Sequence, residues 1–345
     1  MLKDVECKCQ IVKNFAPSWF ASVMGTGVFA ITSMFYSEYI PSLKHLALFL
    51  YYLNIILFFS LLAPWVLRWM FFRNSAMKDL KHPVFSNFYA TIAIAMLVLS
   101  SDFMVIGKNV LFGEIFWFIG APLTIFFAIL TPYIVFSGEH VKIEHINPAW
   151  FIPPVGLIVI PMSGSLLIGN FTGTAREAII FLNYFGWGSG FFLYLSLLAV
   201  CMYRFILHHP LPSTLAPTIW INLGPIGAGS LALINMVSAS PFIHTKEPFF
   251  TFAFLFWGFG IWWVIMAVVM TIHYMKKIEL PYALSWWAFT FPLGAYVASS
   301  HVVSGIFGIR LINHIGFSLY WLLFLLWSVT MIRTAVHTYH GTVFT

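Results

Sequence analysis

The sequence predicts an all-α polytopic membrane protein of ten transmembrane helices arranged as five helical hairpins. The composition is the first reason, because 61% of the 345 residues are hydrophobic and only 8% are charged, whereas soluble domains carry roughly 25% charged residues. The second is a series of ten apolar runs, each near the roughly 20 residues that cross a hydrocarbon core. The third is an alternation of basic residues between the connections, as the positive-inside rule requires.

The ten runs follow one another with short connections, so one transmembrane domain is expected. They cover residues 15–36, 43–71, 84–106, 110–136, 149–169, 176–206, 213–236, 248–274, 283–306 and 312–336. The predicted domain spans 15–336, between an N-terminal tail (1–14) and a C-terminal tail (337–345). Most of the 17 Lys and Arg residues fall on the side that holds both tails. This predicts two cytoplasmic termini and a multi-pass protein of the cell (cytoplasmic) membrane.

Odd-numbered runs differ from even-numbered ones. The odd runs begin with proline or polar residues and carry small residues along one face, as in the fifth, which Pro153, Pro154 and Pro161 interrupt. The even runs are mostly longer and more apolar, although the fourth contains Pro122 and Pro132. Irregular backbone at membrane depth must be buried in protein or line a water-filled cavity. We therefore expect five interrupted helices around a central pore, inside five straighter helices.

The stretch 286–296 in the ninth run combines a proline and a glycine with five aromatic rings. On the helical face of Phe291 the following positions are small: Gly294, Ala295 and Ala298. One interpretation is close packing of membrane helices on small residues. The other is a ring that plugs a narrow pore.

The ionisable residues favour anions over cations as cargo. No acidic residue lies in the middle of a run, and Asp102, near the end of the third run, is expected by the non-cytoplasmic mouth. A pore without buried carboxylates does not repel anions. The basic residues Arg68, Arg73, Lys78 and Lys81 would concentrate anions at the cytoplasmic side, or else only fix topology and bind lipid. His301 is a candidate for pH sensing or anion contact, although an interior structural role is the commoner one for such a histidine.

Four motifs carry a resemblance to a known family: Asn14 to Phe20 (NFAPSWF), Val23 to Gly27 (VMGTG), Trp220 to Pro225 (WINLGP) and Trp286 to Pro292 (WWAFTFP). The chain resembles the tellurite-resistance/dicarboxylate transporter family within the voltage-dependent anion channel superfamily. That family includes bacterial tellurite-resistance channels, fungal malate permeases and sulfite pumps, and plant slow anion channels. The resemblance implies a quasi-fivefold arrangement of hairpins, a homotrimer with one pore in each protomer, and a phenylalanine gate. The gate falls on Phe291, with Phe289 as the runner-up.

The functional prediction follows from these observations. We expect a channel or facilitator for small anions such as chloride, nitrate, sulfite or dicarboxylates, with a proton-coupled carrier of C4-dicarboxylates such as malate as the alternative. The lack of mid-run carboxylates favours the former. The chain resembles most the prokaryotic C4-dicarboxylate or malic-acid transporter branch of the family, which favours the latter. The residues expected to line the pore are Ser18, Ser22, Gly25, Thr26, Ser86, Ala90, Ser163, Gly164, Gly224, Pro225, Gly294, Ala295, Ala298, His301 and Val302.

Other classes of function are disfavoured. A membrane redox enzyme would need paired histidines for haem, and no two histidines form an obvious facing pair. Three cysteines predict no disulfide framework. We therefore expect no enzymatic activity, no cofactor, no metal and no nucleic-acid partner, with the lipid bilayer as the surroundings.

Overall fold

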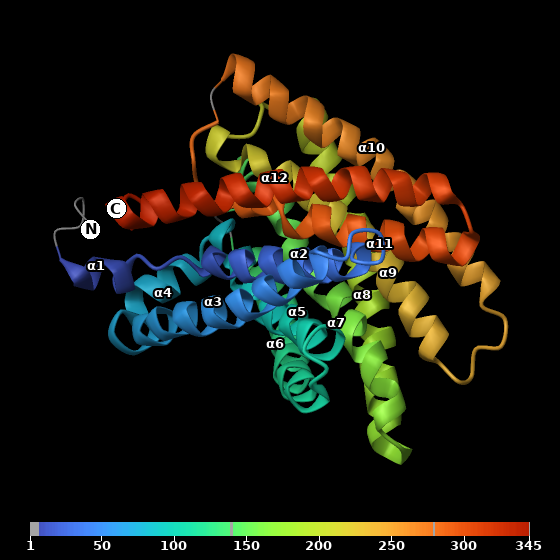
Figure 1. Ribbon diagram of the computed structural model, residues 1–345. Helices are drawn as coiled ribbons and strands as arrows, with labels where there is room; N and C mark the ends of the chain where they lie inside the picture. Colours follow the sequence, from blue (N-terminus) through green and yellow to red (C-terminus); the bar gives the residue numbers. More distant parts are fainter. Residues whose placement is uncertain (1–6, 139–140, 279, 345) are drawn as a thin grey trace.

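The computed structural model describes residues 7–138, 141–278 and 280–344, and the regular secondary structure of this part is helical throughout (Figure 1). Residues 1–6 of the expected N-terminal tail lie outside the described residues. The α-helices are α1 (Lys8–Lys13), α2 (Ala21–Tyr36), α3 (Leu43–Phe71), α4 (Arg73–Leu80), α5 (Ala90–Val105), α6 (Val110–Ser137), α7 (Ile152–Leu167), α8 (Gly173–Leu207), α9 (Leu223–Ala239), α10 (Glu247–Lys277), α11 (Phe291–Phe307) and α12 (Arg310–His340). The 3₁₀ segments are η1 (Pro17–Phe20), η2 (Phe85–Tyr89), η3 (Ile143–His145), η4 (Pro148–Phe151), η5 (Ile168–Asn170), η6 (Ser213–Asn222) and η7 (Leu284–Phe289).

Burial separates the membrane helices into the two predicted groups. Nine helical rods of the described chain are long and apolar enough to cross a membrane. In the rods that contain α2, α5, α7 and α9, 83–94% of the residues of the apolar 18-residue stretch are buried. In α3, α6, α8, α10 and α12 the share is only 22–33%. The tenth rod, η7 with α11, is interrupted at Thr290, so its α-helix is only 17 residues long. The predicted inner and outer helices are confirmed.

The five inner helices form a closed ring. Helices α2, α5, α7, α9 and α11 each contact the next in that order, and α11 contacts α2. Each outer helix packs on its own hairpin partner and on the next inner helix, so the hairpins repeat around the axis (Figure 1). Gly186 and Gly190 of α8 serve this packing, because an added Cβ would lie 2.7 Å from the Leu157 carbonyl oxygen at Gly186 and 2.6 Å from the Pro154 carbonyl oxygen at Gly190.

A side-chain N–H from each outer helix is bonded to the next inner helix. Four of these donors are tryptophan indoles, and their partners are main-chain carbonyls or hydroxyls. The four bonds are Trp117 to the Ile160 carbonyl, 3.0 Å, Trp187 to the Gly229 carbonyl, 2.9 Å, Trp257 to the Ser300 hydroxyl, 2.9 Å, and Trp327 to the Thr26 hydroxyl, 3.0 Å. At the fifth seam, between α3 and α5, the Asn54 amide donates to the Asp102 carboxyl over 2.9 Å. The outer layer is thereby tied to the inner ring at every seam.

Every inner helix begins as a 3₁₀ segment. Proline opens η1 at Pro17 and η4 at Pro148, and Pro217 lies inside η6. Proline has no N–H to donate and is tolerated at a helix start. The segments η1, η2, η4, η6 and η7 contact one another in the same cyclic order as the α-helices that follow them. A ring of irregular backbone therefore surrounds the axis at one end of the molecule, inside protein, as expected for such backbone at membrane depth.

The two ends of the described chain meet at this same end of the molecule (Figure 1). The Asn14 side chain donates to the Phe344 carbonyl over 2.6 Å. The Phe344 ring stacks on Trp19, which stacks in turn on Phe15. Helix α12 runs to His340, past the expected end of the domain at residue 336. A disulfide between Cys7 and Cys9 was not foreseen from the sequence.

Candidate functional site: an apolar constriction beneath a vestibule

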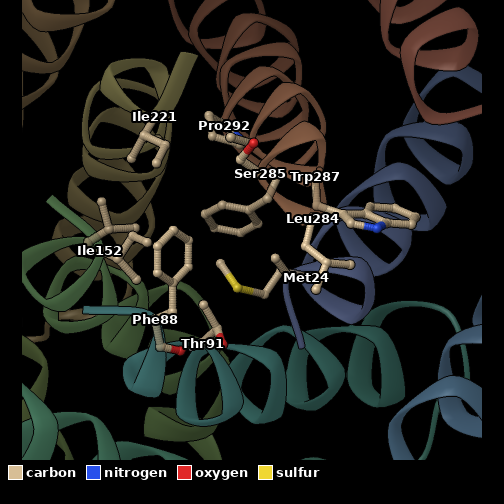
Figure 2. A pocket seen from close by; sticks show the side chains of 14 residues that line it. Met24, Phe88, Thr91, Ile152, Ile221, Leu284, Ser285, Trp287 and Pro292 are labelled. Atoms are coloured by element: carbon tan, nitrogen blue, oxygen red, sulfur yellow. Dashed lines mark hydrogen bonds between the residues drawn. The ribbon is translucent and has the colours of Figure 1, made fainter. Parts of the chain in front are cut away.

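A small cavity of about 40 Å³ lies on the axis of the inner ring. Figure 2 shows Met24, Phe88 and Ile152 pointing into it from three different elements. The residues that line it are Ala21, Met24, Phe88, Thr91, Ile152, Val155, Ile221, Gly224, Leu284, Ser285, Trp287, Ala288, Phe291 and Pro292. All five inner rods contribute, so the cavity belongs to the ring as a whole.

Ten of the fourteen lining residues form five pairs, three positions apart, one pair from each inner rod. The five pairs are Ala21 and Met24, Phe88 and Thr91, Ile152 and Val155, Ile221 and Gly224, and Ala288 and Phe291. Residues three apart share a helical face, so the same face of each rod is turned to the axis. Phe291 therefore belongs to the face of its rod that is turned to the axis, as Met24 and Gly224 do on theirs.

The constriction is almost entirely apolar. Helix α5 contributes one hydroxyl to the lining, that of Thr91. This hydroxyl already hydrogen-bonds to the Pro17 carbonyl at 2.8 Å and the Phe88 carbonyl at 2.6 Å. A cavity of about 40 Å³ has room for about three waters, at 10 to 15 Å³ each, but apolar cavities stay dry. A dry, narrow passage stops ions because hydrophobic constrictions close by dewetting.

The two phenylalanines considered for a gate occupy different surroundings. Phe291 is 2% exposed and lines the cavity. Phe289 is equally buried, but its ring packs edge-on against Trp220 at 5.6 Å and Trp286 at 5.8 Å, away from the cavity lining. Only Phe291 is placed to act on the axis.

A vestibule of about 850 Å³ opens above the constriction, at the end where the inner helices begin. It shares Phe88, Leu284 and Ser285 with the small cavity, so the two spaces adjoin. The titratable residues of its wall are Lys13, Arg68, Lys78, Asp79, His82, Tyr282 and His337. Basic groups outnumber acidic ones, and a basic cleft attracts anions. The other predicted basic residues, Arg73 and Lys81, are absent from its wall.

Arg68 is a structural member of the vestibule wall. Its guanidinium donates to the carbonyls of Lys13 and Phe15 at 3.0 and 2.8 Å, and it forms an ion pair with Asp79. Its charge is therefore neutralised, and the remaining cations are left to act on anions. Burial raises the pKa of the Tyr282 phenol, so this wall residue stays uncharged at neutral pH.

Of the fifteen residues expected to line the pore, Gly224 lines the constriction and Ser18 lines the vestibule. The others are placed against neighbouring side chains or helices. Thr26 accepts from Trp327, and an added Cβ at Gly294 would lie 2.4 Å from a Val28 methyl group. His301 stacks on Phe35. Those that line neither space are Ser22, Gly25, Thr26, Ser86, Ala90, Ser163, Gly164, Pro225, Gly294, Ala295, Ala298, His301 and Val302.

Asp102 differs from the sequence-based expectation. Its side chain is wholly buried rather than placed at a mouth, and it faces Asn54 on α3 rather than the axis. An added Cβ at Gly27 on α2 would lie 2.7 Å from its Oδ2. The protein therefore does contain a buried carboxyl group, in the seam between α2, α3 and α5.

Sequence reasoning missed most of the constriction. Met24, Phe88, Ile152 and Ile221 are ordinary apolar residues in an apolar chain, and their types carry no signal. Of these four, only Met24 matches Phe291 in position, seven residues after the start of its 3₁₀ segment, so an alignment of the hairpins would have picked out Met24 alone.

A sequence profile of the voltage-dependent anion channel family matches residues 14–335. The chain belongs to the voltage-dependent anion channel family. An uncharacterized transporter of Methanocaldococcus jannaschii is 59% identical over 344 residues, covering 100% of this chain and 99% of that protein. More distant members differ in the cargo that their names state. A sulfite efflux pump of Arthroderma benhamiae is 24% identical and covers 84% of this chain and 81% of its own length. A malic acid transport protein of Schizosaccharomyces pombe is 25% identical and covers 84% of this chain and 70% of its own length.

Proposed function

We propose that this protein conducts small anions along the axis of the inner ring and that Phe291 is the gate. The observation that carries the proposal is the position of Phe291, at the meeting point of all five inner rods and below a basic vestibule. Anions gather in the vestibule, and the phenyl ring of Phe291 must move before they enter the constriction.

The gate is held shut by a modest energy. Turning the ring to an off-rotamer position costs about 0.5 to 1.5 kcal/mol. Loss of its apolar contacts adds about 1 to 2 kcal/mol, within the 1.5 to 3 for a fully buried side chain. The sum allows occasional thermal opening while most pores stay closed.

The cargo is proposed to be chloride, nitrate, sulfite or a dicarboxylate such as malate. The names of the two distant relatives support sulfite and malate. The second candidate function is a proton-coupled carrier of C4-dicarboxylates, which the malic acid transport protein and the buried Asp102 favour. Flux in proteoliposomes at clamped pH and voltage separates the two, because channel flux follows the electrochemical gradient of the anion alone.

The setting of the pore is part of the proposal. We infer a cell membrane location with both termini cytoplasmic, which the basic residues at the vestibule end support. We also infer a homotrimer with one pore in each protomer. Cross-linking of the protein in membranes tests the trimer, and labelling of a single added cysteine at the C-terminus from either side tests the topology.

The deciding experiment compares Phe291→Ala with Phe289→Ala in proteoliposomes. Phe291→Ala should raise the flux of a permeant anion several-fold, because the ring no longer fills the axis. Phe289→Ala should leave the flux at the wild-type level. Size-exclusion profiles must match the wild type for both variants. An unchanged flux from well-folded Phe291→Ala would rule out this gate.

A further inference from the structure

The seam between α2, α3 and α5 differs from the other four in what holds it together. Elsewhere a tryptophan N–H bonds to a carbonyl or hydroxyl, groups that do not titrate near neutral pH. Here the contact joins Asn54 to Asp102. It is the one seam of the described ring whose side-chain bond involves a carboxyl group.

This pair of side chains has two acceptor oxygens that lack a hydrogen-bond donor. The Asn54 amide donates to Asp102 Oδ2 at 2.9 Å. The remaining oxygens, Asp102 Oδ1 and Asn54 Oδ1, are both buried acceptors without a partner in the described chain. An ionised aspartate can only accept, whereas a protonated one also donates an O–H. One proton on Asp102 would let the acid donate to the Asn54 carbonyl and close a reciprocal two-bond pair.

The surroundings offer no other way to satisfy the carboxyl group. Both side chains are wholly buried. Among the described residues neither ion pair involves Asp102, and no cationic neighbour acts on it. An isolated ionised carboxylate in a dry interior is very costly.

The elements packed around the pair contribute few titratable groups. Helix α2 presents Gly27 and α5 presents Val98. Helix α3 adds the Tyr51 phenol, which approaches Asp102 and also carries no positive charge. On α6 the nearest acid, Glu114, is turned to Asn170 at the surface.

We propose that Asp102 is a proton-binding site and that its proton, shared with Asn54, locks the seam between the first two hairpins. Loss of the proton leaves a charge and two opposed acceptors inside the seam. The seam matters to the pore because α2 carries Met24 and α5 carries Thr91, both in the constriction. The effect on flux rests on the proposed function, but proton binding does not.

Infrared spectroscopy tests the proton directly. The purified wild-type protein at pH 7 should show the C=O stretch of a protonated carboxylic acid, shifted in protein grown with carboxyl-labelled ¹³C-aspartate. Asp102 is the one buried acidic side chain of the described residues, and exposed acids are ionised at this pH. The band should vanish in Asp102→Asn, which keeps an amide in place of the acid. A wild-type spectrum without a label-sensitive band at pH 7 overturns the proposal, and this outcome needs no variant to fold.

The lock is tested by stability against pH. The folded protein would hold one more proton than the unfolded chain at neutral pH, so its stability falls as pH rises. Asp102→Asn should lose this part of the slope, and Glu114→Gln, a half-buried acid on α6 that contacts Asn170, should keep it. Identical pH profiles for the wild type and Asp102→Asn would contradict the lock. Because both readouts are made without transport, they can fail while the Phe291 flux experiment succeeds, and the reverse.

Discussion

Trp327 on α12 donates its indole N–H to the Thr26 hydroxyl on α2 over 3.0 Å, and this bond joins the last outer helix to the first inner one. Residues at opposite ends of the chain are thereby in direct contact. The same type of bond recurs at three earlier seams, always from an outer helix to the inner helix of the next hairpin. In a membrane, where lipid gives no hydrophobic drive for helices to associate, such bonds and close packing hold helices together.

Trp327→Phe should therefore lower stability, because it keeps an aromatic side chain but removes the indole N–H. The Thr26 hydroxyl is buried and loses its donor, a loss of about 0.5 to 1.5 kcal/mol. Thermal unfolding followed by size-exclusion measures it. Trp321→Phe on the same helix is the control, since Trp321 is 44% exposed and makes no such bond. Equal losses in both variants would mean that the bond contributes nothing.

Gly224→Ala should narrow the constriction without harm to the fold. An added Cβ there meets nothing closer than 3.7 Å, whereas at Gly227 it would lie 2.4 Å from the Tyr296 backbone nitrogen. Alanine at Gly224 also removes the conformational freedom of glycine, an advantage of about 0.5 to 1 kcal/mol. In the Phe291→Ala background we expect lower anion flux at unchanged or higher melting temperature.

Gly227→Ala is the matched variant for that experiment. It forces backbone apart between α9 and α11, and overpacking costs about 1 to 3 kcal/mol. Its melting temperature should fall. If Gly224→Ala lowers the melting temperature as much as Gly227→Ala does, the inference that a methyl group fits beside Gly224 is wrong.

The architecture was predictable from the sequence to a greater depth than the site. Pro17 marked a helix that begins as a 3₁₀ segment. The expected interruption at Pro153, Pro154 and Pro161 was wrong, because all three lie inside the continuous helix α7, and its 3₁₀ segment begins earlier, at Pro148. Phe291 could be chosen as the gate candidate because the motif around it is similar to that of a known family and because small residues follow it. The small-residue stripe itself was misleading, since Gly294 faces Val28 on α2 and serves helix packing. Periodicity defines a face but not the direction in which the face points.

The opposite case is Asp102, whose position near a helix end suggested an exposed mouth. Its burial depends on Asn54, 48 residues earlier on another helix, and on Gly27 on a third. Contacts between three separated segments leave no local pattern in one sequence. The seam could only be found in three dimensions.

The lysines of the vestibule should set the rate of anion entry. Lys13 and Lys78 both line its wall. Their joint replacement by glutamine in the Phe291→Ala background should lower flux by up to about tenfold at low salt, because steering by exposed charge is lost. The difference should shrink in 1 M salt, where screening reduces the reach of a charge to about 3 Å. Lys276→Gln with Lys277→Gln, at the end of α10 and outside the vestibule, is the control; an equal effect would assign the result to net charge.

Arg68→Gln should weaken the fold far more than Arg73→Gln. Arg68 is 3% exposed and pairs with Asp79, whereas Arg73 lies on the surface. Breaking a fully buried pair by removing one partner costs about 3 to 5 kcal/mol, which is an upper bound for this pair because the Asp79 side chain is 28% exposed. Thermal or denaturant unfolding should show the difference, and equal stabilities would contradict a structural role for Arg68.

The loss of Arg68 should also affect the pore, because the carbonyls of Lys13 and Phe15, to which Arg68 donates, belong to the segment leading into η1. Release of that segment loosens the rod that carries Ala21 and Met24 into the constriction. The folded fraction of Arg68→Gln should therefore leak anions with Phe291 intact, while Arg73→Gln stays closed.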